Sequence, residues 1–76
     1  MDAYILIQTE VGMAGKVAKE LSRIEGISSA EGVAGPYDVI ARASAATVDQ
    51  LGQLVVSKVQ AIEGITRTLT CTVVRL

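Results

Sequence analysis

The apolar positions of this chain follow two alternating periods, which together predict a strand-helix-strand unit that occurs twice. Residues 3–9 hold consecutive apolar side chains, which is typical of a strand covered on both faces. Residues 13–24 place apolar side chains every three or four positions, as an amphipathic helix does. The same two periods predict four further elements: strands at 27–34, 38–43 and 65–76, and a second helix at 48–62.

An internal echo supports this division of the chain. Ile24-Glu25-Gly26-Ile27 recurs as Ile62-Glu63-Gly64-Ile65, and each copy closes a helical stretch and opens a strand. Each glycine falls where a left-handed helix C-cap is expected, because glycine has no Cβ to oppose that conformation. Thr47, three residues before Gln50, has the spacing of a capping box at the start of the second helix. The pattern predicts an α+β, ferredoxin-like βαββαβ fold in one domain, residues 1–76, with two helices on one face of a four-stranded antiparallel sheet.

Two helices cover only one face of such a sheet, so the other face needs a different cover. In the fourth strand we expect Leu69, Cys71 and Val73 to face the helices, and Thr68 and Thr70 to face the opposite side. The chain has 76 residues and is 50% hydrophobic. A domain of this size buries only about 60–65% of its extended-chain surface on folding. We therefore expect a second copy to cover the free face, giving a sheet-to-sheet homodimer.

Composition excludes several classes of function. No run approaches the roughly 18–20 apolar residues of a membrane span, and the acid at Asp2 argues against a signal peptide, so a cytoplasmic protein is expected. The net charge is −1, with seven basic and eight acidic residues dispersed along the chain, which disfavours direct nucleic-acid binding. There is no histidine and only one cysteine. No metal site, no cofactor and no catalytic residue is therefore predicted, and the protein is not expected to be an enzyme.

Asp38 is the strongest candidate for a ligand-binding side chain. It starts the third strand directly after Gly35-Pro36-Tyr37, a turn with free backbone amides. One interpretation is a structural acid that caps the backbone or pairs with Arg42 or Arg67. The other is a receptor for the ammonium group of a small ligand.

Other candidates are weaker. Thr68 and Thr70 offer two hydroxyls roughly 7 Å apart on one face of a strand, but threonine is also a favoured strand residue. Cys71 is expected to be a small buried apolar side chain. Residues 12–16, Gly-Met-Ala-Gly-Lys, fail the phosphate-loop pattern, which needs four residues between its glycines and Ser or Thr after the lysine.

The sequence resembles the RAM domain, the amino-acid-sensing half of Lrp/AsnC-type (feast/famine) transcriptional regulators. The resemblance covers essentially the whole chain and is carried by four segments: Ala3–Ile7, the Gly35–Asp38 corner, Leu51–Val55 and Ile62–Thr70. The DNA-binding half of the family does not precede these segments, so the sequence is similar to a stand-alone RAM protein.

This resemblance implies a sheet-to-sheet dimer that joins others in a ring, often an octamer, with free amino acids as effectors in clefts between dimers. It also implies a possible full-length Lrp/AsnC-type regulator as partner. Asp38 would receive the ligand's ammonium group. The ligand's polar ends would be held by two hydroxyls and the loop backbone: Thr68, Thr70, Ala34, Gly35 and Tyr37. Pro36 removes one N–H donor from that loop.

Three alternatives remain open at this point. An ACT-like regulatory domain would bind amino acids on the same topology but pair side by side rather than by stacking sheets. A purely structural oligomer would bind no ligand. An enzyme of the dimeric α/β-barrel type shares the topology, but it is disfavoured because such sites usually recruit a histidine or a cofactor, and neither is available here.

Overall fold

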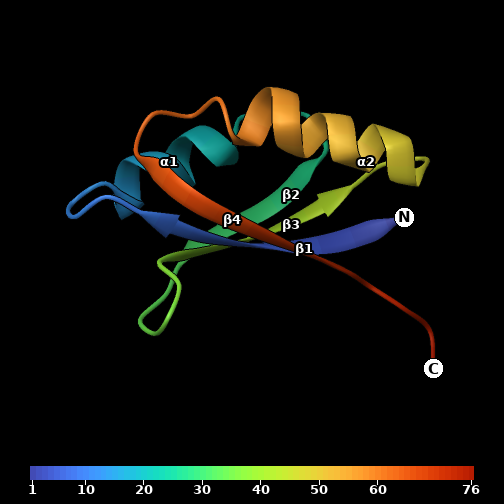
Figure 1. Ribbon diagram of the computed structural model, residues 1–76, viewed down its shortest axis with the longest axis horizontal. Coiled ribbons are helices and arrows are strands. Elements are labelled where there is room, and N and C mark those ends of the chain that lie inside the picture. The colour runs from blue at the N-terminus through green and yellow to red at the C-terminus, as the bar shows by residue number, and fades with distance from the viewer.

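The computed structural model describes residues 1–76 as two layers, with both helices on one face of a four-stranded antiparallel sheet (Figure 1). The strands lie in the order β2-β3-β1-β4. The elements follow the predicted order: β1 Asp2–Thr9, α1 Ala14–Leu21, β2 Ile27–Gly32, β3 Val39–Ser44, α2 Val48–Leu54, a π-helical turn Val55–Val59 that continues α2, and β4 Ile65–Thr72. The predicted ferredoxin-like fold is confirmed.

Local chemistry explains where the helices begin and end. At the start of α2 the Gln50 amide donates to Thr47 Oγ1 at 3.1 Å, as the capping pattern predicted. Gly26 and Gly64 have φ of 99° and 103°, so the predicted left-handed conformation is confirmed. The predicted C-cap position is wrong: the helices are capped by Ser22 and Gln60, and each glycine lies four residues later, in the turn before a strand. Helix α1 ends at Leu21 rather than at residue 24, because the amides of Arg23 and Ile24 bond three residues back and tighten the chain into a turn.

The sequence did not predict the π-helical turn after α2. The Gln60 amide bonds to the Val55 carbonyl, five residues back, at 2.9 Å. Across this wide turn Val55 and Val59 both stay buried. Val48, in the first turn of α2, is by contrast 62% exposed.

The core lies between the sheet and the two helices. Its fully buried large side chains come from both layers: Ile5, Ile7, Val17, Leu21, Val39 and Val59. On β3, Val39 and Ala41 face this core. The central strands β1 and β3 thus supply the sheet side of the core, and alternate residues of both strands point the other way.

The expected facing of β4 is wrong. Thr68 is paired with Ile7 and Thr70 with Ile5, and directly paired residues in antiparallel strands share a face. Because Ile5 and Ile7 are buried beneath the helices, the two threonines lie on the helix side. Hydrogen bonding to β1 fixes this register, and β4 is an edge strand whose helix-side residues meet water at the rim of the helix layer. Threonine is therefore tolerated there.

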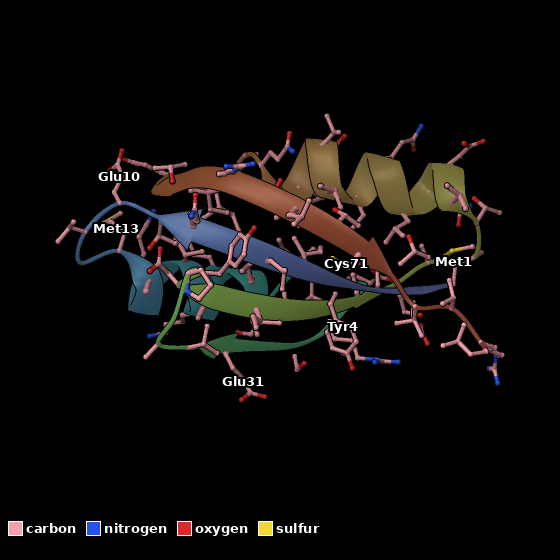
Figure 2. All side chains as sticks on the ribbon, turned by 60° about the horizontal axis from the view of Figure 1, so that its bottom comes forward. Met1, Tyr4, Glu10, Met13, Glu31 and Cys71 are labelled. Atoms are coloured by element: carbon pink, nitrogen blue, oxygen red, sulfur yellow. The ribbon has the colours of Figure 1, made fainter.

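Leu69 and Cys71 consequently lie on the sheet face that no helix covers (Figure 2). Cys71 is exposed, so the expectation of a buried apolar cysteine is also wrong. Strand β4 ends at Thr72 rather than at residue 76. Its partner β1 begins at Asp2, and the last bond between the two runs from the Val73 amide to the Asp2 carbonyl at 2.8 Å.

Candidate functional site

The face of the sheet opposite the helices, here called the open face, is covered by no part of the chain (Figure 2). Its central rows carry apolar side chains from three strands: Tyr4, Leu6, Ile40 and Leu69. Tyr4 is 42% exposed and Leu69 is 44% exposed. Large apolar groups with this much accessible surface, side by side on a sheet, are typical of a face that meets another surface.

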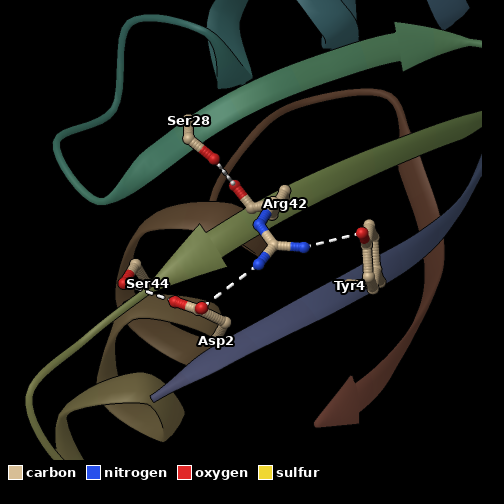
Figure 3. A network of polar contacts seen from close by, with 5 residues as sticks. All are labelled: Asp2, Tyr4, Ser28, Arg42 and Ser44. Carbon is tan, nitrogen blue, oxygen red and sulfur yellow. Dashed lines mark hydrogen bonds and ion pairs between the residues drawn. The ribbon is translucent and has the colours of Figure 1, made fainter. Parts of the chain in front are cut away.

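One end of the open face is polar and internally bonded. Figure 3 shows the Arg42 guanidinium donating to the Tyr4 hydroxyl at 2.6 Å and to Asp2 Oδ2 at 3.1 Å. The Ser44 hydroxyl donates to Asp2 Oδ1 at 2.7 Å. The guanidinium carbon also lies 5.0 Å from the centroid of the Tyr4 ring, within cation–π range. Arg42 therefore pairs with Asp2 and not with Asp38.

This network predicts an acid-sensitive contribution to stability. The Ser44 hydrogen bond, helped by the Arg42 charge, holds the pKa of Asp2 below its ordinary value of 3.8. A lowered folded-state pKa stabilises the fold above the ordinary value, and this stabilisation is lost as the pH falls through the lowered one. We expect Asp2→Asn to melt at a lower temperature than the unchanged protein near neutral pH, with the difference shrinking below about pH 4. A melting difference that stays constant into acid would contradict this assignment.

Asp38 sits half-buried at the entrance to β3 and closes the far end of β1. Its Oδ2 accepts hydrogen bonds from the Thr9 amide at 2.8 Å and the Thr9 hydroxyl at 3.4 Å. Its own amide donates to the Ile7 carbonyl at 2.9 Å, which fixes the backbone. The side chain therefore caps the backbone and pairs with neither arginine considered for it. Its second oxygen, Oδ1, accepts no hydrogen bond from the chain.

The loop from β2 to β3 projects from the sheet on the side away from the helices (Figure 1). Ala34, Gly35 and Pro36 are exposed and Tyr37 is half-buried. The Pro36 carbonyl accepts a hydrogen bond from Gln8 Nε2 at 3.0 Å, which ties the loop to β1. The amides of Ala34, Gly35 and Tyr37 donate no hydrogen bond within the chain. Three free donors thus lie within four residues of the Asp38 carboxylate.

The two threonines predicted for the site lie elsewhere. Thr68 Oγ1 accepts a hydrogen bond from Gln60 Nε2 at 3.1 Å. It lines a hollow of about 330 Å³ together with Gln60 and Arg67. Thr70 lines a separate hollow of about 300 Å³ beneath α2. Two further hollows of about 620 and 600 Å³, on the helix side, are lined by none of the predicted site residues.

Within one chain the predicted site is therefore divided. Strand β1 lies between β3, which Asp38 directly precedes, and β4, which carries Thr68 and Thr70. Sequence reasoning also missed Gln60, the partner of Thr68. No spacing rule could have found it, because the π-helical turn sets the position of Gln60.

The chain matches the Lrp/AsnC ligand binding domain over residues 2–76. It belongs to this family, whose members are ligand-binding domains of transcriptional regulators. Membership favours the RAM-domain interpretation over the ACT-like one.

Individual proteins agree with this assignment. An uncharacterized HTH-type transcriptional regulator of Pyrococcus furiosus, PF0250, is 31% identical over 71 residues, which are 90% of this chain and 47% of the regulator. The chain thus spans about half the length of the curated relatives it matches. The crystal structure of the hypothetical protein PHS023 from Pyrococcus horikoshii superposes with a TM-score of 0.88 at 27% identity, over 97% of this chain and 90% of that one.

A second similar structure is the complex of the transcriptional regulator NMB0573 from Neisseria meningitidis with L-Met. It superposes with a TM-score of 0.86 over 97% of this chain and 49% of that one, at 14% identity. This likeness shows a shared fold. Separately, neither helix of the chain is long and apolar enough to cross a lipid bilayer.

Proposed function

We propose that this chain is a cytoplasmic effector-binding and oligomerisation module that holds a free amino acid between dimers of a ring assembly. The observation that carries the proposal is the half-buried Asp38 carboxylate with one unpaired oxygen beside three free loop amides. A zwitterion requires an anion and a set of donors a few ångströms apart, and this corner offers both. Each charge-assisted hydrogen bond there would contribute about 1.5–3 kcal/mol.

The division of the site by β1 supports a ligand pocket shared between subunits. Asp38 and the loop amides would come from one subunit, while Thr68 and Thr70 would come from a neighbouring one. The ligand would then stabilise the assembly by mass action, and assembly would raise ligand affinity. The L-Met complex of the Neisseria meningitidis regulator, which shares this fold, supports an amino acid as the effector class.

The open face supports the dimer within this assembly. It presents the apolar side chains of Tyr4, Leu6, Ile40 and Leu69 without cover, and burial of such groups is worth about 25 cal/mol per Å² before the costs of association. A second copy, sheet against sheet, is the occupant we propose. A full-length Lrp/AsnC-type regulator is the proposed partner of the ring.

Neutralising Asp38 is the direct test of this site. Asp38→Asn keeps an amide oxygen to accept from Thr9 but removes the charge that would bind an ammonium group. We expect amino-acid affinity to fall at least about tenfold, roughly 1.4 kcal/mol, while the dimer persists. The ligand would first be found by thermal-shift screening of the twenty amino acids, and affinity then measured by titration calorimetry.

Asp49→Asn is a matched control, because Asp49 is an exposed acid in the first turn of α2, remote from the loop. The Asp49→Asn variant should bind the amino acid with the same affinity as the unchanged protein. Equal affinity in Asp38→Asn would remove Asp38 from the site. If none of the twenty amino acids shifts the melting temperature or the assembly mass, the alternative of a purely structural oligomer replaces this proposal.

A further inference from the structure

Two charges on the open face have no ion-pair partner within the chain. Asp2 and Arg42 satisfy each other there, and the only other ion pair, Lys16 with Glu20, lies on α1. Glu31 and Arg67 remain unpaired. Glu31 is on β2 and Arg67 is on β4, the two edge strands of the sheet.

The strand register places both side chains on the open face. Glu31 is paired with Ile40, and Ile40 is paired with Leu6. The residues before and after this row in β1 and β3 are buried beneath the helices, so the row itself, with Glu31, points to the open face. Figure 2 shows Glu31 pointing away from the helix layer. Arg67 is paired with Gln8 and alternates with Thr68, which faces the helices. An acid thus marks one edge of the open face and a base marks the other, about three strand spacings or 14 Å apart.

We infer that the second copy packs on the open face with its β2 over β4 of the first, so that Glu31 of each subunit lies beside Arg67 of the other. This inference rests on the dimer of the proposed function and specifies its orientation. A two-fold axis parallel to the strands exchanges the two edges and keeps each residue at its own level along the strands. Arg67 is two residues, about 7 Å, from the level of Glu31, a distance that two long side chains span.

The other simple orientation is disfavoured by charge. A two-fold axis across the strands would stack β2 on β2 and β4 on β4, bringing acids toward acids and bases toward bases. Like charges at an interface oppose association, whereas complementary ones fix its register. The arrangement of Glu31 and Arg67 therefore selects the orientation in which unlike edges meet.

Charge reversal tests this orientation. Glu31→Arg alone would place bases against bases twice per dimer, and Arg67→Glu alone would place acids against acids. We expect each single variant to raise the dimer dissociation constant at least about tenfold in low salt. An equimolar mixture of the two variants should regain dimerisation as a heterodimer, because both contacts are then between opposite charges. The double variant should regain it as a homodimer. Sedimentation velocity over a dilution series measures all four.

Matched controls come from the helix side. Glu25→Arg and Arg23→Glu make the same charge changes on exposed residues that line a hollow between the helices. Neither should change the dimer dissociation constant by more than about twofold. Circular dichroism would verify that every variant remains folded.

Crosslinking gives an independent measure of the same geometry. Ser29 is level with Arg42, Arg42 with Tyr4, and Tyr4 with Cys71. In the inferred dimer the cysteine of a Ser29→Cys variant lies over the partner's Cys71, so a short bismaleimide should join position 29 to position 71 between subunits. Crosslinks from 29 to 29 and from 71 to 71 would instead report the opposite orientation.

The outcomes separate this inference from the proposed function. A dimer that resists both charge reversals, or one that gives 29–29 crosslinks, overturns the inferred orientation and leaves the proposed dimer standing. A lone protomer at micromolar concentration overturns both. Loss of dimer in each single variant with recovery in the mixture supports the inference.

Discussion

Replacing Ile5 by alanine is expected to lower the free energy of unfolding by about 2–5 kcal/mol. Ile5 is fully buried at the centre of β1, between its neighbours in β3 and β4 and beneath the helices. Removing three carbon atoms there leaves a cavity that rigid strands cannot close. A domain of this length has a total stability of roughly 4–11 kcal/mol, so the loss is a large part of the whole. Urea denaturation measures it.

Two matched substitutions set the scale for Ile5. Ile5→Val removes one methylene and should cost about 0.5–1.5 kcal/mol. Val56→Ala, on a side chain that is 65% exposed in the π-helical turn, should stay within about 0.5 kcal/mol. If Ile5→Ala cost no more than Val56→Ala, the described core would be wrong.

Replacing Gly64 by alanine is expected to destabilise the fold by about 1–3 kcal/mol. Its φ of 103° is a conformation that residues with a Cβ adopt only with strain. An added Cβ would also lie 2.9 Å from Met13 Cε and 3.1 Å from Met13 Cβ, so that side chain must move. Gly52→Ala is the control, and it is expected to change the stability in the opposite direction. Gly52 lies within α2 with nothing within 4 Å of the added carbon, so alanine should stabilise it by about 0.5–1 kcal/mol.

A double-mutant cycle with Met13→Ala separates the two causes at Gly64. Truncating Met13 removes the contact with the side-chain terminus but leaves the backbone strain, so only part of the loss should be recovered. Full recovery would mean that the left-handed conformation costs nothing, contrary to the expectation for alanine. Equal stability of Gly64→Ala and the unchanged protein would contradict both.

The period of the apolar residues was sufficient to predict the order of helices and strands, because a helix buries every third or fourth residue and a strand buries every second one. The consecutive apolar run of the first strand gives it apolar side chains on both faces: Ile5 and Ile7 point to the core, and Tyr4 and Leu6 to the open face, whose cover by a second copy stays a prediction. The repeated Ile-Glu-Gly-Ile correctly located the turns before β2 and β4, because the positive φ of Gly26 and Gly64 is a backbone conformation that favours glycine.

The facing of the last strand could not be read in the same way. Apolarity suggested that Leu69 and Cys71 face the helices, but cross-strand hydrogen bonds to β1 decide the facing, and an edge strand need not be apolar on its core side. The candidate site followed from the resemblance, which places the ligand between dimers. A linear sequence contains no strand order, so it could not show that β1 separates Asp38 from Thr68 and Thr70 within one chain.

Hydrogen bonds at and next to Thr9 connect Asp38 with the segment that leads into β4. Asp38 holds the Thr9 amide, and the next amide, that of Glu10, donates to the Gly64 carbonyl at 2.8 Å, directly before β4 begins. The Asp38 carboxylate and the turn before β4 are therefore linked through two consecutive backbone amides at the end of β1, and no helix residue takes part in the link.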